Sequence, residues 1–166
     1  MATVIRGDDN FDTSYIKAIA ILADVKGVAA EGGSAVQGWQ TRELNTEMSD
    51  VQNIVTLASN QFTLQAGQYL IEWNAPFYNT DRTHTKLYNI TNSADESIGG
   101  SDYTAGSSNA TTRTGGSAVV TISGATTYSI MMNCQSAAAT HGLGLGTLTG
   151  SSNSVYTRVL IHKIGA

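Results

Sequence analysis

The chain has 166 residues, of which 41% are hydrophobic and only 13% are charged, and its formal net charge is −4. This length fits one domain with a real apolar core, and the composition argues against a disordered chain. Nine Lys and Arg stand against thirteen Asp and Glu, and the basic residues are scattered singly, which argues against a nucleic-acid partner.

The beginning of the chain is polar and acidic. We predict that residues 1–14 form an N-terminal arm and that residues 15–166 form one domain. No basic region followed by an apolar core is visible, so we expect no signal peptide. The apolar stretch 18–25 contains Asp24 and falls short of the roughly 20 residues of a membrane span, so we expect no membrane partner. The lone Cys134 is expected to be a small buried apolar residue.

Short strand signals follow along the chain. The Ile and Val content of residues 15–30 favours a strand over the short amphipathic helix that the spacing also allows. Further strands are predicted at 61–64, 68–77, 83–91, 118–123, 127–135 and 155–164. The Ser/Gly/Thr-rich segments 92–117 and 140–153 are predicted to be long loops, the first with room for one weak polar strand. This pattern predicts an all-β fold, an antiparallel two-sheet sandwich of jelly-roll type.

Three predicted strands are apolar on both faces. They contain the runs Tyr69-Leu70-Ile71, Ile130-Met131-Met132 and Val159-Leu160-Ile161. Strands of an antiparallel sandwich usually keep one face wet, so the second apolar face needs a cover. Burying each such side chain stabilises by about 1.5–3 kcal/mol. We therefore expect a homo-oligomer, with cover by the protomer's own long loops as the alternative.

Several sequence blocks occur in an order and spacing that are informative together. They are ADVK at 23–26, GWQTRELNT at 38–46, FTL at 62–64, GQYLIE at 67–72, KLYNIT at 86–91 and YTRVLIHKI at 156–164. Together they resemble the jelly roll of the complement C1q globular head and tumour necrosis factor superfamily, in the versions carried on bacteriophage fibres and capsids. The resemblance extends over residues 16–166.

This resemblance implies a ten-strand sandwich that assembles as a homotrimer, with the sheet of the first and last strands lining the threefold axis. It also implies that the polar loops lie at the outer surface or apex. The predicted trimer-interface residues are Leu70, Met131, Tyr156, Leu160 and Ile164. The candidate ligand residues in the loops are Ser101, Asp102, Tyr103, Asn109, His141 and Asn153. The candidate docking residues of the arm are Val4, Ile5, Arg6 and Phe11.

Catalytic and metal-site patterns are weak. The chain has no Gly-x-Ser-x-Gly elbow, and His84, His141 and His162 lack a metal-binding spacing. We expect no enzyme, no cofactor and no metal, although a threefold axis would bring three copies of His162 together. Trp39 and Trp73 lie inside strand-forming blocks, which favours core or interface anchors over rings that stack on a sugar.

Resemblance and composition together predict a bacteriophage virion structural protein, assembled in the host bacterial cytoplasm and displayed on the particle surface. The arm would hold the trimer on phage capsid or tail proteins, as a capsid decoration or head fibre. The short arm, with no fibre shaft, favours this role. The alternative is the receptor-binding tip of a tail fibre, which recognises a host surface glycan through the polar loops.

Overall fold

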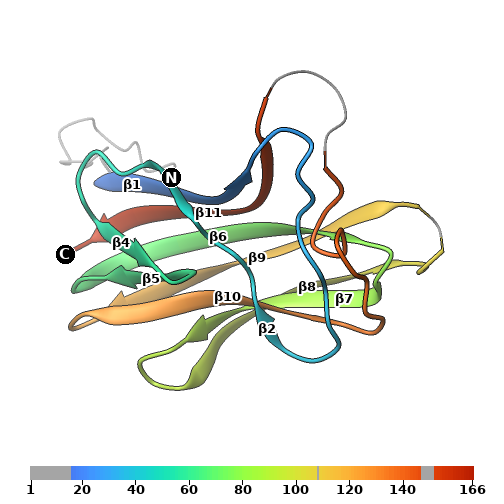
Figure 1. Cartoon of the computed structure of the whole chain (residues 1–166). Helices are drawn as coiled ribbons and strands as arrows, with labels where there is room; N and C mark the ends of the chain where they lie inside the picture. The colour runs from blue at the N-terminus through green and yellow to red at the C-terminus, as the bar shows by residue number, and fades with distance from the viewer. Residues whose placement is uncertain (1–15, 108, 147–151) are drawn as a thin grey trace, which may run out of the picture.

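The chain folds into two antiparallel β-sheets that lie face to face (Figure 1). The computed structural model describes residues 16–107, 109–146 and 152–166, and these ranges contain strands and no helix. The strands are β1 (Ala18–Lys26), β2 (Gln40–Thr41), β3 (Thr46–Ser49), β4 (Val55–Ala58), β5 (Gln61–Leu64), β6 (Gly67–Tyr78), β7 (Asp81–Asn89), β8 (Ala94–Thr104), β9 (Thr111–Ile122), β10 (Thr126–Cys134) and β11 (Ser154–Gly165). The predicted all-β two-sheet fold is confirmed.

The order of the strands is that of a jelly roll. The first sheet runs β3-β1-β11-β6-β9, and the second runs β4-β5-β10-β7-β8 with β2 beside β10. Among the described strands, the chain changes sheet at every connection except those from β4 to β5 and from β7 to β8. The first long strand and the last strand are direct neighbours, with Ala18 opposite Lys163. The domain is therefore closed by pairing its two ends.

The core lies between the sheets and follows from strand alternation. In β11, Val159 and Ile161 are buried while the intervening Leu160 is only half-buried. Trp73 from β6 lies in this core, and its indole N–H donates to Thr85 Oγ1 of β7 over 2.9 Å, joining the two sheets. Trp73 is therefore a core anchor, as predicted.

The strand predicted for residues 15–30 is confirmed as β1, and the buried state predicted for Cys134 is confirmed as well. The Cys134 thiol donates to the carbonyl of Val36 over 3.2 Å. Burial raises the pKa of this thiol above its usual value. Cys134 is thus a buried residue that helps to hold the segment of Val36 against the end of β10.

The prediction of long loops over 92–117 is wrong, because this segment forms β8 and the first part of β9. Its composition reflects a close approach of the two sheets at this side of the sandwich. A Cβ on Gly99 of β8 would come within 2.8 Å of the Gly115 carbonyl oxygen of β9, and one on Gly116 within 2.5 Å of the Trp73 ring. Glycine is needed here for space, and the described residues of this segment outside the two strands are 92–93, 105–107 and 109–110.

Long connections gather at the end of the sandwich where β1 ends and β11 begins (Figure 1). The segment 27–39 is joined to the segment 135–146 by backbone hydrogen bonds, including the reciprocal pair between Ala35 and Ala138. The N–H of Tyr78, at the end of β6, donates to the carbonyl of Gly142 over 3.1 Å. We call this the loop end. The Gly/Ser-rich loop predicted from residue 140 is confirmed for its described parts.

Candidate functional site

The outward face of the first sheet carries a row of four side chains across four strands, and three of them are apolar. In this row, His162 of β11 lies between Ile19 of β1 and Leu70 of β6. Val119 of β9 lies opposite Leu70 and ends the row. Ile19 is 38% exposed and Val119 62% exposed, although this sheet already buries its other face in the core. This outward surface of the first sheet is therefore largely apolar, whereas the outward face of a monomeric sandwich is usually polar and solvated.

A second row runs parallel to the first and contains Leu160. This side chain lies between Ile21 of β1 and Glu72 of β6 and is half-buried. Met48 of β3 extends the apolar surface and is 45% exposed. We call these two rows with Met48 the apolar face.

Polar groups lie within the apolar face and at its edge. His162 Nε2 lies 3.5 Å from the Glu72 carboxylate. Toward the loop end, an Arg113 guanidinium N–H donates to Asn74 Oδ1 over 2.7 Å, and Arg158 contacts Met48 Sδ at 3.6 Å. Burial, with a smaller contribution from the charge of Arg158, lowers the pKa of Arg113. The face is thus apolar across its strands and cationic on one side.

The structure brings together only part of the predicted interface set. Leu70 and Leu160 point outward on neighbouring strands, and Ile164 is half-buried at the irregular end of β11. Met131 belongs to β10 of the second sheet, so it cannot share a face with Leu160. Tyr156 is 3% exposed inside its own chain and donates its hydroxyl hydrogen to the carbonyl of Ala30, so it is a core residue.

The predicted ligand residues divide in a similar way. Ser101, Asp102 and Tyr103 lie in β8 and not in a loop, with Tyr103 opposite Arg82 of β7. Asp102 accepts a hydrogen bond from Thr112.

His141 and Asn109 do meet at the loop end, where both contact Tyr78. The His141 ring stands edge-on to the Tyr78 ring at 4.9 Å between centroids, and Tyr78 donates to Asn109 Oδ1 over 3.1 Å. Asn153 is exposed just before β11. The predicted docking residues Val4, Ile5, Arg6 and Phe11 lie outside the described residues.

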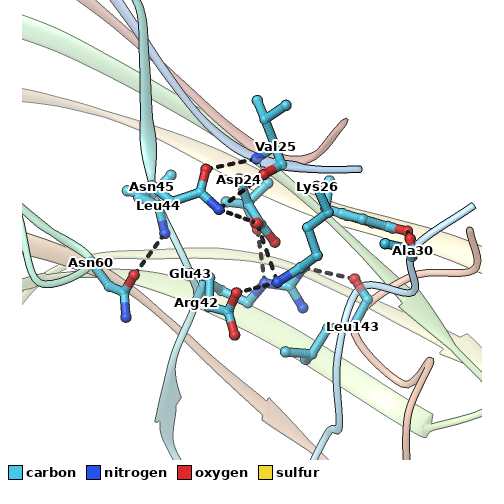
Figure 2. Close-up of polar contacts among 12 residues, drawn as sticks. Asp24, Val25, Lys26, Ala30, Arg42, Glu43, Leu44, Asn45, Asn60 and Leu143 are labelled. Carbon is cyan, nitrogen blue, oxygen red and sulfur yellow. Dashed lines mark hydrogen bonds and ion pairs between the residues drawn. The ribbon is translucent and has the colours of Figure 1, made fainter. Parts of the chain in front are cut away.

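Sequence reasoning missed a buried polar cluster behind the loop end (Figure 2). Arg42 follows β2 and is fully buried. Its Nε donates to Thr157 Oγ1 and its Nη2 to the Leu143 carbonyl, both over 2.9 Å. Its guanidinium lies 5.5 Å from the centroid of the Phe77 ring. Burial lowers the pKa of Arg42 to about 10, although the nearby Asp24 carboxylate acts in the opposite direction.

Asp24 is the acidic partner of this cluster and comes from β1. Asn45 donates to its Oδ1 over 3.0 Å, and Lys26 reaches between Asp24 and Glu43 (Figure 2). Burial raises the pKa of Asp24, and Lys26 opposes this rise. The cluster ties β1, β2 and the loop segment of Leu143 together. The sequence signal was the charged trio Asp24, Arg42 and Glu43 inside strand-forming blocks.

Replacing Asp24 with asparagine is expected to change the pH dependence of stability. Because the folded-state pKa lies above the ordinary value of 3.8, the folded chain holds this proton more tightly than the unfolded chain. The contribution of Asp24 to the free energy of unfolding therefore falls as the pH rises above 3.8. Urea unfolding between about pH 3.5 and 7 should show this fall weakened in the Asp24→Asn variant.

Asp81 provides the control of opposite sign. Hydrogen bonds from Ser136 and from the Gly106 N–H lower its pKa, so its contribution to stability is lost as pH falls through the folded-state pKa. Asp81→Asn should flatten the acid side of the curve and leave the fall attributed to Asp24 in place. An Asp24→Asn curve parallel to the wild-type curve over the whole range would contradict the assignment.

Within the described ranges, no three His, Cys, Asp or Glu side chains gather in a way that would hold a metal ion. No helix in the same ranges is long and apolar enough to cross a membrane.

No protein-family model and no curated protein sequence matches this chain. Solved structures do match it. The globular domain of zebrafish complement 1qA superposes with a TM-score of 0.56 and 15% identity, covering 89% of this chain and 97% of that one. Murine APRIL superposes with a TM-score of 0.56 and 8% identity, covering 88% of this chain and 98% of that one. The Eiger TNF of S. frugiperda superposes with a TM-score of 0.57 and 10% identity, covering 87% of this chain and 90% of that one. The chain therefore has the jelly-roll fold that the complement 1qA globular domain shares with the TNF-type proteins.

Proposed function

We propose that the chain assembles as a homotrimer through the apolar face of the first sheet and is displayed on the surface of a larger particle. The observation that supports assembly is the pair of apolar rows through Leu70 and Leu160. These side chains point away from the core of their own sheet. A second copy of the same face would bury them, and the trimer that the fold resemblance implies would do so around one axis.

The particle that we propose is a bacteriophage virion, with the trimer as a capsid decoration or head fibre assembled in the host bacterial cytoplasm. The ordered blocks from Ala23 to Ile164 that resemble phage-borne jelly rolls support this role. The arrangement of the domain is compatible with it. The start of β1 pairs with the end of β11 at one end, opposite the loop end, so an arm preceding β1 would hold the domain with its loops directed outward (Figure 1). Residues 1–14 would dock on capsid or tail proteins, and three arms would act together through avidity. The proposal includes no catalytic role.

The second candidate is the receptor-binding tip of a tail fibre that recognises a host surface glycan. Two exposed aromatic rings favour it, Trp39 at 40% and Tyr103 at 59% exposure. Both lie on the second sheet, away from the apolar face.

The assembly proposal is tested by measuring mass in solution. Sedimentation equilibrium of the full chain at micromolar concentration is expected to give three times the 17.4 kDa of one chain. A stable monomer at that concentration would overturn the proposal.

The site on the particle is tested separately, by immunogold labelling of intact virions. Labelling spread over the head supports decoration, and labelling confined to the tail supports the tail-fibre role. If the purified protein blocks infection when added to host cells, it acts in adsorption.

A further inference from the structure

The outward face of the second sheet carries an aromatic ring held in a fixed position. Trp39 precedes β2 and lies over β7, with its ring centroid 4.8 Å from that of His84 and 4.0 Å from Lys86 Nζ. Lys86 beneath it is almost fully buried and pairs with Asp95. His84 and Lys86 both belong to β7 and contact the ring from the sheet beneath it, so the exposed part of the indole faces solvent.

The segment that carries Trp39 is anchored at several points. The N–H of Val36 donates to Gln40 Oε1 over 2.7 Å, and the carbonyl of Val36 accepts from the Cys134 thiol. Gln37 donates to the carbonyl of Gln135, beyond the end of β10. The ring is therefore preorganised, which lowers the entropic cost of binding.

A second exposed ring and a guanidinium complete the surface. Tyr103 of β8 stands opposite Arg82 of β7, two residues along the strand from His84. Tyr103 is one strand across the sheet and two residues along it from His84, the residue beneath Trp39. These two spacings place Tyr103 on the order of 8 Å from the region beneath Trp39. Two shallow hollows beside these groups share Arg82 and His84. One is also lined by Ser101, Asp102 and Tyr103, and the other by Asn133 and Gln135. The Asp102 carboxylate already accepts a hydrogen bond from Thr112.

Arg82 is a cation of this surface that makes no direct ion pair among the described residues, although its charge acts on the neighbouring Asp81 carboxylate. Its Nη1 donates to Gln135 Oε1 over 3.0 Å, and no carboxylate of the described residues lies within ion-pair distance of it. The neighbouring Asp81 accepts hydrogen bonds from Ser136 and the Gly106 N–H instead. The remaining guanidinium donors of Arg82 are thus available to an outside acceptor, and a planar carboxylate suits their fork.

We propose that this surface binds an acidic saccharide, with a sugar ring stacked on Trp39 or Tyr103 and its carboxylate on Arg82. The apolar C–H face of a sugar ring complements the negative face of an aromatic ring. Amide and hydroxyl groups between the rings supply hydrogen bonds to sugar hydroxyls. A protein partner would need a continuous apolar centre, and here polar groups separate the two rings. The proposal deepens the glycan-recognition alternative given under Proposed function, and it rests on that alternative for its biological use.

The test uses the full chain and two matched pairs of probes. Hyaluronan tetrasaccharide is compared with uncharged chitotetraose, and sialyllactose with lactose, by calorimetry and by tryptophan fluorescence. Trp73 is buried and Trp39 exposed, so a change in fluorescence reports on Trp39. At least one acidic probe should bind about tenfold more tightly than its neutral counterpart, as expected for a charge-assisted contact.

The variants Trp39→Ala and Arg82→Gln should each weaken acidic-probe binding at least about tenfold, and Arg82→Gln should remove the preference for the acidic probe. Arg113→Gln changes an exposed arginine of the other sheet and should bind as the wild type does. Absence of binding at about 10 mM of every probe would overturn the proposal. So would equal binding of both members of each pair, or binding that both variants retain. The mass of the assembly is measured in parallel, so failure of the trimer and failure of the saccharide site are read separately.

Discussion

Replacing Leu160 with aspartate is expected to reduce the assembled mass to that of a single 17.4 kDa chain. Leu160 lies in the middle of the apolar face, between Ile21 and Glu72. Losing the burial of one leucine costs about 1.5–3 kcal/mol for each protomer. The introduced carboxylate would also have to be desolvated at the interface, beside Glu72, which adds to the cost of association.

Sedimentation equilibrium and light scattering check this result, and circular dichroism checks that the variant is still folded. Leu145→Asp is the matched control, because Leu145 is 47% exposed in the loop connecting β10 to β11 and not on the apolar face. The control should retain the mass of the wild type. A folded Leu160→Asp variant at the trimer mass would show that another surface carries the assembly.

Replacing Arg42 with methionine is expected to lower the free energy of unfolding by about 3–5 kcal/mol. The substitution keeps much of the side-chain volume. It leaves Thr157 Oγ1 and the Leu143 carbonyl without their donors, and it removes the cation that lies near the buried Asp24. Each of these changes acts on groups that the fold has withdrawn from water.

Urea unfolding at one fixed protein concentration measures this effect, because assembly makes apparent stability depend on concentration. Arg82→Met serves as the control at an exposed site of the second sheet, away from the apolar face, where the change in the free energy of unfolding should stay within about 0.5 kcal/mol. An Arg42→Met variant as stable as this control would mean that the buried cluster contributes nothing net to the fold.

Strand positions were predictable wherever the sequence carries β-branched and aromatic residues with clear turns between them. The outward direction of Leu70 and Leu160 was predictable too, because a run that is apolar on both faces needs cover on both. The same rule failed to tell one sheet from the other. Met131 belongs to an equally apolar run, but its strand lies in the second sheet, where it stands opposite Lys86, the residue beneath Trp39.

Other features depend on tertiary contacts that leave little trace in local composition. β8 and β9 have the composition of loops because the space between them admits only glycine at Gly99 and Gly116. The burial of Arg42 depends on acceptors more than a hundred positions along the chain, Thr157 and Leu143. The sequence identified only some residues of the proposed saccharide surface. Tyr103 was a candidate, but its position relative to Trp39 depends on strand order, which alternation does not encode.

The close approach of β8 and β9 also has a consequence for solubility. These strands are the outermost members of their sheets on one side, a position where unpaired backbone groups readily recruit a strand from another molecule. The hydroxyl of Ser97 donates to the carbonyl of Ser117 across the gap, and the glycines hold the two backbones together. Each border strand thus shields the other, and fibril-like stacking is disfavoured on this side even in concentrated solution.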